Sequence, residues 1–293
     1  RGQDGRKEKG VENIKTMWEL GTVFPIPYWL SIVICTFLAG AYVGSIYLWN
    51  VVYRSEKERR RLGNRDDPWT IRRRFASVGL ACAVGLGVMF LAAGPQVSMG
   101  DVLWAMGIRT DATVLLAATL PLASVMLLFA GPLLHLVLDG DLQLPDFDVY
   151  CARNLLVCPL TEEFVFRACV VPLFLAGGAS RTTAVYASPL FFGLAHLHHV
   201  LAGKPVVMCL FQLLYTTVFG WISTYLFIRT GHLIAPFVAH AFCNYMGFPD
   251  FAGGYRHDKR LLILPAYVLG LAGFFLLTPY LTLPGLYDND VYS

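Results

Sequence analysis

The sequence predicts an all-α membrane protein that crosses the bilayer several times, and two features of the chain support this fold class. Of its 293 residues, 56% are hydrophobic and only 15% are charged, whereas a soluble domain of this length carries nearer a quarter of charged residues. Apolar runs long enough, or nearly so, to cross about 30 Å of hydrocarbon as helices recur along the chain. They cover residues 23–51, 76–95, 112–138, 149–176, 182–203, 206–228, 231–248 and 261–282. We therefore expect about eight spanning helices in a single domain over residues 1–293.

The flanks of the first three runs indicate topology. The first run follows a charged tail, RGQDGRKEKGVENIKT, and lacks a small-residue cleavage site after a short core, so we expect a spanning helix and not a removed signal peptide. Between the first and second runs, residues 54–74 hold nine Lys and Arg against four acidic residues. By the positive-inside rule, this segment is cytoplasmic. With eight spans, the loops near 139–148, 202–205 and 249–260 share its side.

Besides its role in topology, the basic segment 54–74 has two readings, attraction to anionic lipid headgroups and a nucleic-acid surface, and we prefer the first. Attraction to anionic lipid headgroups explains such a juxtamembrane cluster without further assumptions. Membrane lipid is therefore the expected neighbour of this segment, and no nucleic acid is expected. The acidic loop after the third run is expected to be a solvated turn.

The fourth run raises a different question, because residues 159–167 read PLTEEFVFR and place two glutamates and an arginine in an apolar helix. A charged residue at the bilayer centre costs on the order of 2.5–3.5 kcal/mol, so such groups usually face a cavity and pair with something. Glu163 and Arg167 are i and i+4 with the acid first, which suits an ion pair and a structural role. Glu162, about 100° around the helix, is left without a local partner. It is the candidate general base.

The fifth and seventh runs add further polar groups. His196 ends the string FFGLAH, four residues after Phe192, and His240 and Asn244 are i and i+4 on one face of the seventh run. Taken singly, an intramembrane His or Asn is as often a hydrogen-bonding residue between helices as a functional one. Three helices that each offer polar groups at compatible depth favour a shared cavity.

Three motifs in this order resemble those of the ABI family of intramembrane proteases: EExxxR at Glu162–Arg167, FxxxH at Phe192–His196 and HxxxN at His240–Asn244. The longer strings RNLLVCPLTEEFVFRA, FGLAHLHH and FIRTGHLIAPFVAHAFCNYMGFP are similar to its eukaryotic branch, the Ras-converting CAAX prenyl endopeptidases. The resemblance is strongest over residues 150–250, so we expect a catalytic core over about 149–250.

The resemblance implies an enzyme of the endoplasmic-reticulum membrane, with an active site open to the cytosol. Its substrates would be farnesylated or geranylgeranylated CaaX proteins such as small GTPases, from which it removes the last three residues. The expected spans agree with this, because the fourth run enters from the cytoplasmic side and the fifth returns there. Glu162 and His196 can then share one cavity, which the end of the seventh run approaches.

Peptide hydrolysis needs an activated water, a stabilised oxyanion and a proton for the leaving amine. We expect Glu162 with His196 to activate the water, and His240 and Asn244 to donate hydrogen bonds to the oxyanion. Glu163, Arg167 and Phe192 would support the site. No cofactor and no metal are expected, but a metalloprotease remains the mechanistic alternative, because two His, a Glu and an Asn could ligate zinc. Against zinc, there is no HExxH motif and Asn is a poor ligand.

A transporter or scaffold is the alternative from another functional class. In that reading the buried Glu, His and Asn form a proton or substrate pathway. Transporters often show internal repeats with broken helices at matching places in two halves. No such pairing is visible here, and the polar motifs all lie in the second half of the chain.

Overall fold

The computed structural model describes residues 20–195 and 205–292. All regular elements in those ranges are helices, which confirms the all-α fold class. The helices up to residue 139 are α1 (Leu20–Val23), α2 (Tyr28–Val52), α3 (Glu56–Gly63), α4 (Pro68–Ala92), α5 (Met99–Ala105), α6 (Val114–Leu128) and α7 (Ala130–Asp139). The helices from residue 149 onward are α8 (Val149–Cys151), η1 (Ala152–Val157), α9 (Cys158–Glu163), η2 (Phe164–Cys169), α10 (Val170–Ala176), α11 (Arg181–Ala195), α13 (Val206–Thr230), α14 (Ile234–Met246), α15 (Phe251–Arg256), α16 (Arg260–Leu281) and η3 (Pro284–Tyr287).

The long helices identify a protein that spans a membrane several times. Among the described residues, α2, α4, α13 and α16 are each long and apolar enough to cross a bilayer. A fifth span is formed if α6 and α7, which meet at 77°, count as one. In the most apolar 18-residue stretch of each of these four helices, only 22–28% is buried inside the protein. Most of their apolar surface is therefore free to face lipid.

The other predicted runs have less regular structures, so the observed spans are fewer than the eight apolar runs. The fourth run is a continuous series of helical segments, α8 to α10, in which the π-helices η1 and η2 flank α9. The fifth run is described as α11, up to residue 195, and the seventh forms α14 with 13 residues.

The π-helical turns have a local cause. Pro159 and Pro172 each follow one of them. A proline lacks the N–H that would bond to the carbonyl four residues earlier, and its ring crowds that carbonyl. Widening the preceding turn relieves both problems. The result is that α9, which carries the two glutamates, is set between two irregular turns.

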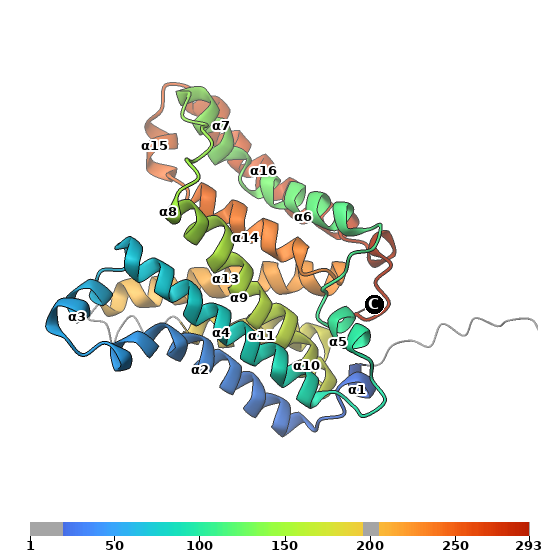
Figure 1. Ribbon diagram of the computed structural model, residues 1–293. Coiled ribbons are helices and arrows are strands. Elements are labelled where there is room, and N and C mark those ends of the chain that lie inside the picture. Colours follow the sequence, from blue (N-terminus) through green and yellow to red (C-terminus); the bar gives the residue numbers. More distant parts are fainter. Residues whose placement is uncertain (1–19, 196–204, 293) are drawn as a thin grey trace, which may run out of the picture.

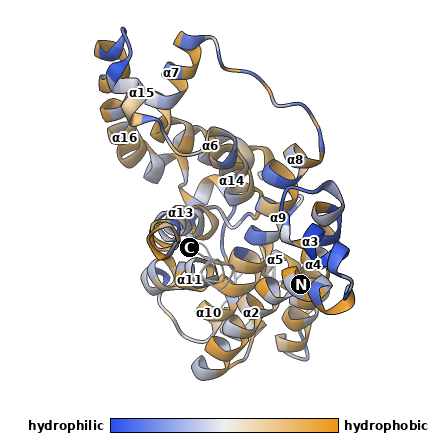
Figure 2. Ribbon diagram, turned by 90° about the vertical axis from the view of Figure 1, so that its left-hand side faces the viewer, coloured by the Kyte–Doolittle hydropathy of each residue, from blue (hydrophilic) through white to orange (hydrophobic). Residues whose placement is uncertain are grey.

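The helices form two neighbouring groups, with η1 and α9 of the fourth run between them (Figure 1). In one, α2 packs beside α4, and α10, α11 and α13 lie next to them. In the other, α6 and α7 pack against α16, and α14 packs against α6. Figure 2 shows hydrophilic residues gathered on α3 and at the outer end of α7, whereas α2, α4 and α10 are largely hydrophobic. This distribution fits helices in lipid whose connecting segments face water.

Small residues bring helices close together beside the site. A Cβ on Gly220 of α13 would lie 2.6 Å from Cβ of Pro189 on α11 and 3.4 Å from a guanidinium nitrogen of Arg167. A Cβ on Gly193 would lie 2.5 Å from Oγ1 of Thr217. Because a real side chain does not fit at such distances, glycine is what allows α11 and α13 to approach.

Candidate active site

The helix α9 presents its two adjacent glutamates to different surroundings. Glu163 has no exposed side-chain surface, while the side chain of Glu162 is 19% exposed and lines a cavity. This follows from helix geometry, because neighbouring residues point about 100° apart. Glu162 is therefore the carboxylate that a substrate can reach, and Glu163 is the one that the protein encloses.

Glu163 is held by three side chains from three different segments. Arg167, one turn later, makes two contacts of 3.2 Å with its two oxygens. The hydroxyl of Ser223 on α13 donates to Oε2 at 2.6 Å. Nδ1 of His240 on α14 lies 2.6 Å from Oε1. A buried carboxylate is stable only when it is paired and hydrogen-bonded, and these contacts meet that requirement.

The ring of His240 connects the two glutamates. Its Nδ1 bonds to Glu163, and its Nε2 lies 3.7 Å from Oε2 of Glu162. An ionised carboxylate only accepts hydrogen bonds, so Nδ1 carries a proton and donates it to Glu163. Nε2 is then the ring atom that faces the cavity. The sequence-based pairing of Glu163 with Arg167 alone missed this link between helices.

Asn244 lies one turn after His240 on α14, and both line the cavity. Its Nδ2 donates to the backbone carbonyl of Asn154 at 2.9 Å. That carbonyl belongs to η1, where π-helical winding alters the regular hydrogen-bond ladder. An amide nitrogen has two N–H groups, so the second one remains for another acceptor.

One cavity of about 1050 Å³ unites these groups. Glu162, His240 and Asn244 line it together, and so does Phe192. It extends from these residues to the basic segment around α3, since Arg59 and Arg65 also line it. The structure thus brings together motif residues that are up to 82 positions apart (162 to 244) in the sequence.

Aromatic rings surround the buried pair. The guanidinium of Arg167 lies 4.9 Å from the ring centre of Phe192 and 5.8 Å from that of Phe219. The same two rings pack against the imidazole of His240, at 6.4 and 4.5 Å between centroids. These contacts exclude water from Glu163 and its partners, and they fix the plane of the imidazole.

His196 lies outside the described residues, so the structure does not place the histidine of the second motif. Two further residues near the glutamates escaped sequence analysis. Ser223 is a single hydroxyl in an apolar run, and Tyr42 of α2 contacts the hydroxyl of Thr161 at 3.0 Å beside Glu162. Only the presence of a polar group in a membrane-length helix could have signalled Ser223.

Two contacts join the expected loops to neighbouring segments. Arg153 of η1 bonds to Asp66 of the basic segment at 2.8 Å. His257, in the loop before α16, bonds to Asp139 at 2.9 Å. The first contact ties the basic segment 54–74 to the start of the fourth run, and the second ties residues 249–260 to the end of α7. Residues 202–204 lie outside the described part.

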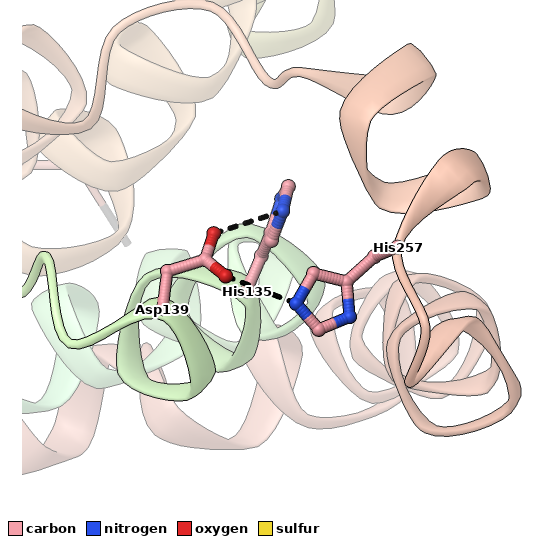
Figure 3. A group of neighbouring side chains, drawn as sticks. All are labelled: His135, Asp139 and His257. Carbon is pink, nitrogen blue, oxygen red and sulfur yellow. Dashed lines mark hydrogen bonds and ion pairs between the residues drawn. The ribbon is translucent and has the colours of Figure 1, made fainter.

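A second cluster, formed by His135, Asp139 and His257, could be taken for a metal site (Figure 3). Its ligand atoms lie within 4.8 Å of one another, and Asp139 bonds to both imidazoles. However, the backbone N–H of Lys259 donates to Nδ1 of His257 at 2.9 Å. Nε2 of that ring then carries the proton and donates to Asp139, whereas a metal ligand needs its lone pair there. The cluster is a hydrogen-bonded link between α7 and the loop before α16, and Asp139 is not the simple solvated turn expected.

Comparison with known proteins adds an independent observation. A family model described as "Type II CAAX prenyl endopeptidase Rce1-like" matches residues 146–246. CAAX prenyl protease 2 of Homo sapiens is 39% identical over 287 residues, covering 89% of this chain and 84% of the human protein. CAAX prenyl protease 2 of Rattus norvegicus is 37% identical, with 89% and 82% covered. Probable CAAX prenyl protease 2 of Schizosaccharomyces pombe is 35% identical, with 77% and 84% covered. No solved structure matches the chain.

Proposed function

The chain belongs to the Rce1-like family of type II CAAX prenyl endopeptidases, and we propose that it cleaves its substrates in the cavity that Glu162, His240 and Asn244 line. It is a membrane protease of prenylated CaaX proteins. The transporter alternative is not favoured by these relatives. The observation that carries the proposed site is the meeting, in one cavity, of an accessible carboxylate, an imidazole and an amide from separate motifs.

Glu162 acts as the general base in this proposal. Its side chain is partly exposed to the cavity and has the Nε2 atom of His240 at 3.7 Å, so a water can lie beside both groups. Glu162 takes a proton from that water as it attacks the scissile carbonyl, and later gives the proton to the leaving amine. Such general acid–base catalysis is worth about 10²–10⁴-fold. His196, which lies outside the described residues, is proposed to help hold the same water, as the resemblance of the FxxxH motif implies.

The oxyanion is stabilised by Asn244 and His240. Asn244 uses one N–H for the carbonyl of Asn154 and offers the other to the cavity. His240 donates from Nε2 only as an imidazolium, because Nδ1 is already bound to Glu163. Preorganised donors of this kind are usually worth about 10²–10³-fold each in turnover.

Glu163 is a positioning residue in this scheme. It holds Nδ1 of His240 at 2.6 Å and is itself held by Arg167 and Ser223. The arrangement fixes which imidazole nitrogen faces the cavity. A group that does not touch the substrate thus determines the direction in which His240 can donate.

A metal is the rival mechanism, and the same residues bear on it. A zinc ion bound by His240 and Glu162 would supply a polarised water. The hydrogen bond from Nδ1 to Glu163 suits a metal-bound histidine as well as a metal-free one. We prefer the metal-free scheme because Asn244 is a poor zinc ligand and a good hydrogen-bond donor.

The substrate side of the proposal concerns small GTPases whose CaaX cysteine is farnesylated or geranylgeranylated. Their prenyl chains would lie between helices, where each buried methylene contributes about 0.8 kcal/mol. The basic segment 54–74, at the cavity's end, is proposed to face the cytosol. The endoplasmic-reticulum membrane is the proposed location.

Incubation of the protein in lipid vesicles with a farnesylated CaaX peptide tests this function directly. We expect release of the intact aaX tripeptide, measured by mass spectrometry, and no cleavage of the same peptide without its prenyl group. Glu162→Gln, in equal amount and with an unchanged melting temperature, is the matched control and is expected to be inactive. Equal tripeptide release by parent and Glu162→Gln would overturn the assignment of the site.

A further inference from the structure

Basic side chains dominate one end of the catalytic cavity. Glu162 is the only carboxylate among the described residues that line it, whereas four arginines line the same space: Arg59, Arg65, Arg74 and Arg153. The scheme above uses none of these arginines. An electropositive end of a cavity whose other end holds the catalytic groups indicates that part of the substrate is an anion.

Three consecutive arginines on α4 show which of them is available. Arg72 is exposed and does not line the cavity. Arg73 stacks on the ring of Trp69, 3.5 Å from its centre, and donates to the hydroxyl of Tyr53 at 3.1 Å. Arg74 is half-buried and lines the cavity. Of the three, Arg74 alone lines the cavity.

Arg74 has little to bind in the structure. Its one hydrogen bond among the described residues goes to the carbonyl of Leu62 at 3.5 Å, the limit of such a bond. None of the described carboxylates lies within ion-pair distance of it. Five N–H donors on a planar fork are suited to a carboxylate, which they can bind through two parallel hydrogen bonds.

The surrounding charges increase the need for an anion. Arg65 and Arg153 lie close enough for their charges to repel Arg74. Both are partly neutralised by Asp66, at 3.7 and 2.8 Å. Asp66 also lies close enough to Arg74 for their charges to attract, but its ion pairs are with Arg65 and Arg153, so no described carboxylate pairs directly with Arg74.

The position of Arg74 along α4 matches the length of the leaving tripeptide. Cys82 on the same helix contacts the carbonyl of Thr161, the residue before Glu162, at 3.9 Å. Arg74 lies eight residues earlier on α4, which is about 12 Å along the helix axis. Three extended residues span roughly 10–11 Å. A peptide cleaved beside Glu162 would therefore bring its end to Arg74.

We propose that Arg74 binds the α-carboxylate of the substrate's C-terminal residue. This inference rests on the proposed function and deepens it, because it explains how a cavity selects a chain end. The ion pair would be made only when the cut lies three residues from a free terminus. A longer or blocked tail would leave Arg74 without its partner.

Two peptides that differ only at the terminus test the proposal: a farnesylated CaaX peptide as the free acid and as the C-terminal amide. We expect the parent to have a kcat/KM about 10- to 100-fold higher for the acid, the range of a hydrogen-bonded ion pair. Arg74→Gln should lose this preference by slowing cleavage of the acid while leaving that of the amide nearly unchanged. Arg72→Gln is the matched control and should keep the preference. Arg74→Lys should restore part of it.

Binding measured on the Glu162→Gln background separates this proposal from the catalytic one. There the acid should bind more tightly than the amide, and the further change Arg74→Gln should abolish the difference, whether or not any peptide is cleaved. The proposal is overturned if the parent protein cleaves the acid and the amide with the same kcat/KM. This test does not depend on whether the Arg74 variants fold. Suppose instead that Arg74→Gln loses activity on both the acid and the amide, and only in vesicles that contain phosphatidylglycerol. That result also overturns the proposal and assigns Arg74 to a lipid phosphate.

Discussion

His240 and Glu163 are joined by a hydrogen bond of 2.6 Å between Nδ1 and Oε1. The bond connects α14 to the π-helical junction after α9 and directs the other ring nitrogen toward Glu162. Because two neighbouring glutamates contact the two nitrogens of one imidazole, their substitutions should have different consequences. The first two predictions exploit this asymmetry.

Glu162→Gln is expected to lower kcat by at least about 10²-fold while leaving the melting temperature unchanged. The substitution keeps the shape of the side chain and removes the base, and Glu162 has no ion pair with Arg167 to lose. Tripeptide release at saturating substrate, together with thermal unfolding in detergent, measures both quantities. A variant with parental kcat would exclude Glu162 as the base.

Glu163→Ala is expected to lower both stability and activity. It leaves the buried guanidinium of Arg167 without its carboxylate, and breaking a buried pair costs about 3–5 kcal/mol. Adding Arg167→Leu should recover part of the melting temperature, because it removes the orphaned charge, but should not recover kcat. Activity that returns with stability would show that Glu163 only stabilises the fold and does not position His240.

Asn244→Ala is expected to reduce kcat about 10²-fold or more, with little effect on KM. A donor that acts only on the developing oxyanion contributes to turnover and not to substrate binding. Asn244→Asp should be equally poor, because it replaces the free N–H with an acceptor and adds negative charge. His240→Ala should behave similarly, and the double variant should lose less than the product of the two. A change confined to KM would assign these residues to substrate binding.

Removal of metal should leave activity intact. If Glu162 and His240 act on water and oxyanion without zinc, protein purified in a strong chelator keeps its kcat. Elemental analysis of the active protein should then find well under one metal per chain. Zinc in equal proportion to protein, whose removal abolishes activity and whose return restores it, would replace this mechanism with the metal-dependent one.

Asp111 should make stability depend on pH at the end of the bundle away from the basic segment. Burial raises its pKa, but the hydroxyl and amide of Thr113 and the guanidinium of Arg109 outweigh this and lower the pKa to about 2. An aspartate with a pKa below its usual 3.8 stabilises the fold above pH 3.8 and loses that contribution as the pH falls toward 2. Asp111→Asn should lower the melting temperature at pH 7 and reduce the additional loss in this acidic window. An unchanged acid profile would refute the link.

Sequence reasoning was most successful where a relationship lies within one helix. The i, i+4 spacing predicted a Glu163–Arg167 pair, which the structure contains. The same spacing placed His240 and Asn244 on one face, and both line the cavity. Such relationships follow from 3.6 residues per turn and do not depend on neighbouring helices.

Sequence reasoning was weaker where local hydrogen bonding departs from the regular helix. Length and hydropathy indicated eight runs, but the fourth run contains η1 and η2, and the third bends by 77°. Hydropathy reports how apolar a segment is and not how its backbone is wound. The prolines 159 and 172 were visible, yet whether a helix kinks, ends or widens at a proline depends on what packs beside it.

The sequence by itself determined that this is an all-α membrane protein with two glutamates, an arginine and a His/Asn pair at helical spacing. Only the tertiary structure decided that Glu163 holds His240 while Glu162 faces the cavity, and that Arg74, among three consecutive arginines, is the one that lines it. The physical reason is that helix geometry sets spacing along one segment. Which side chain finds a partner on another helix is set by packing between segments far apart in the chain.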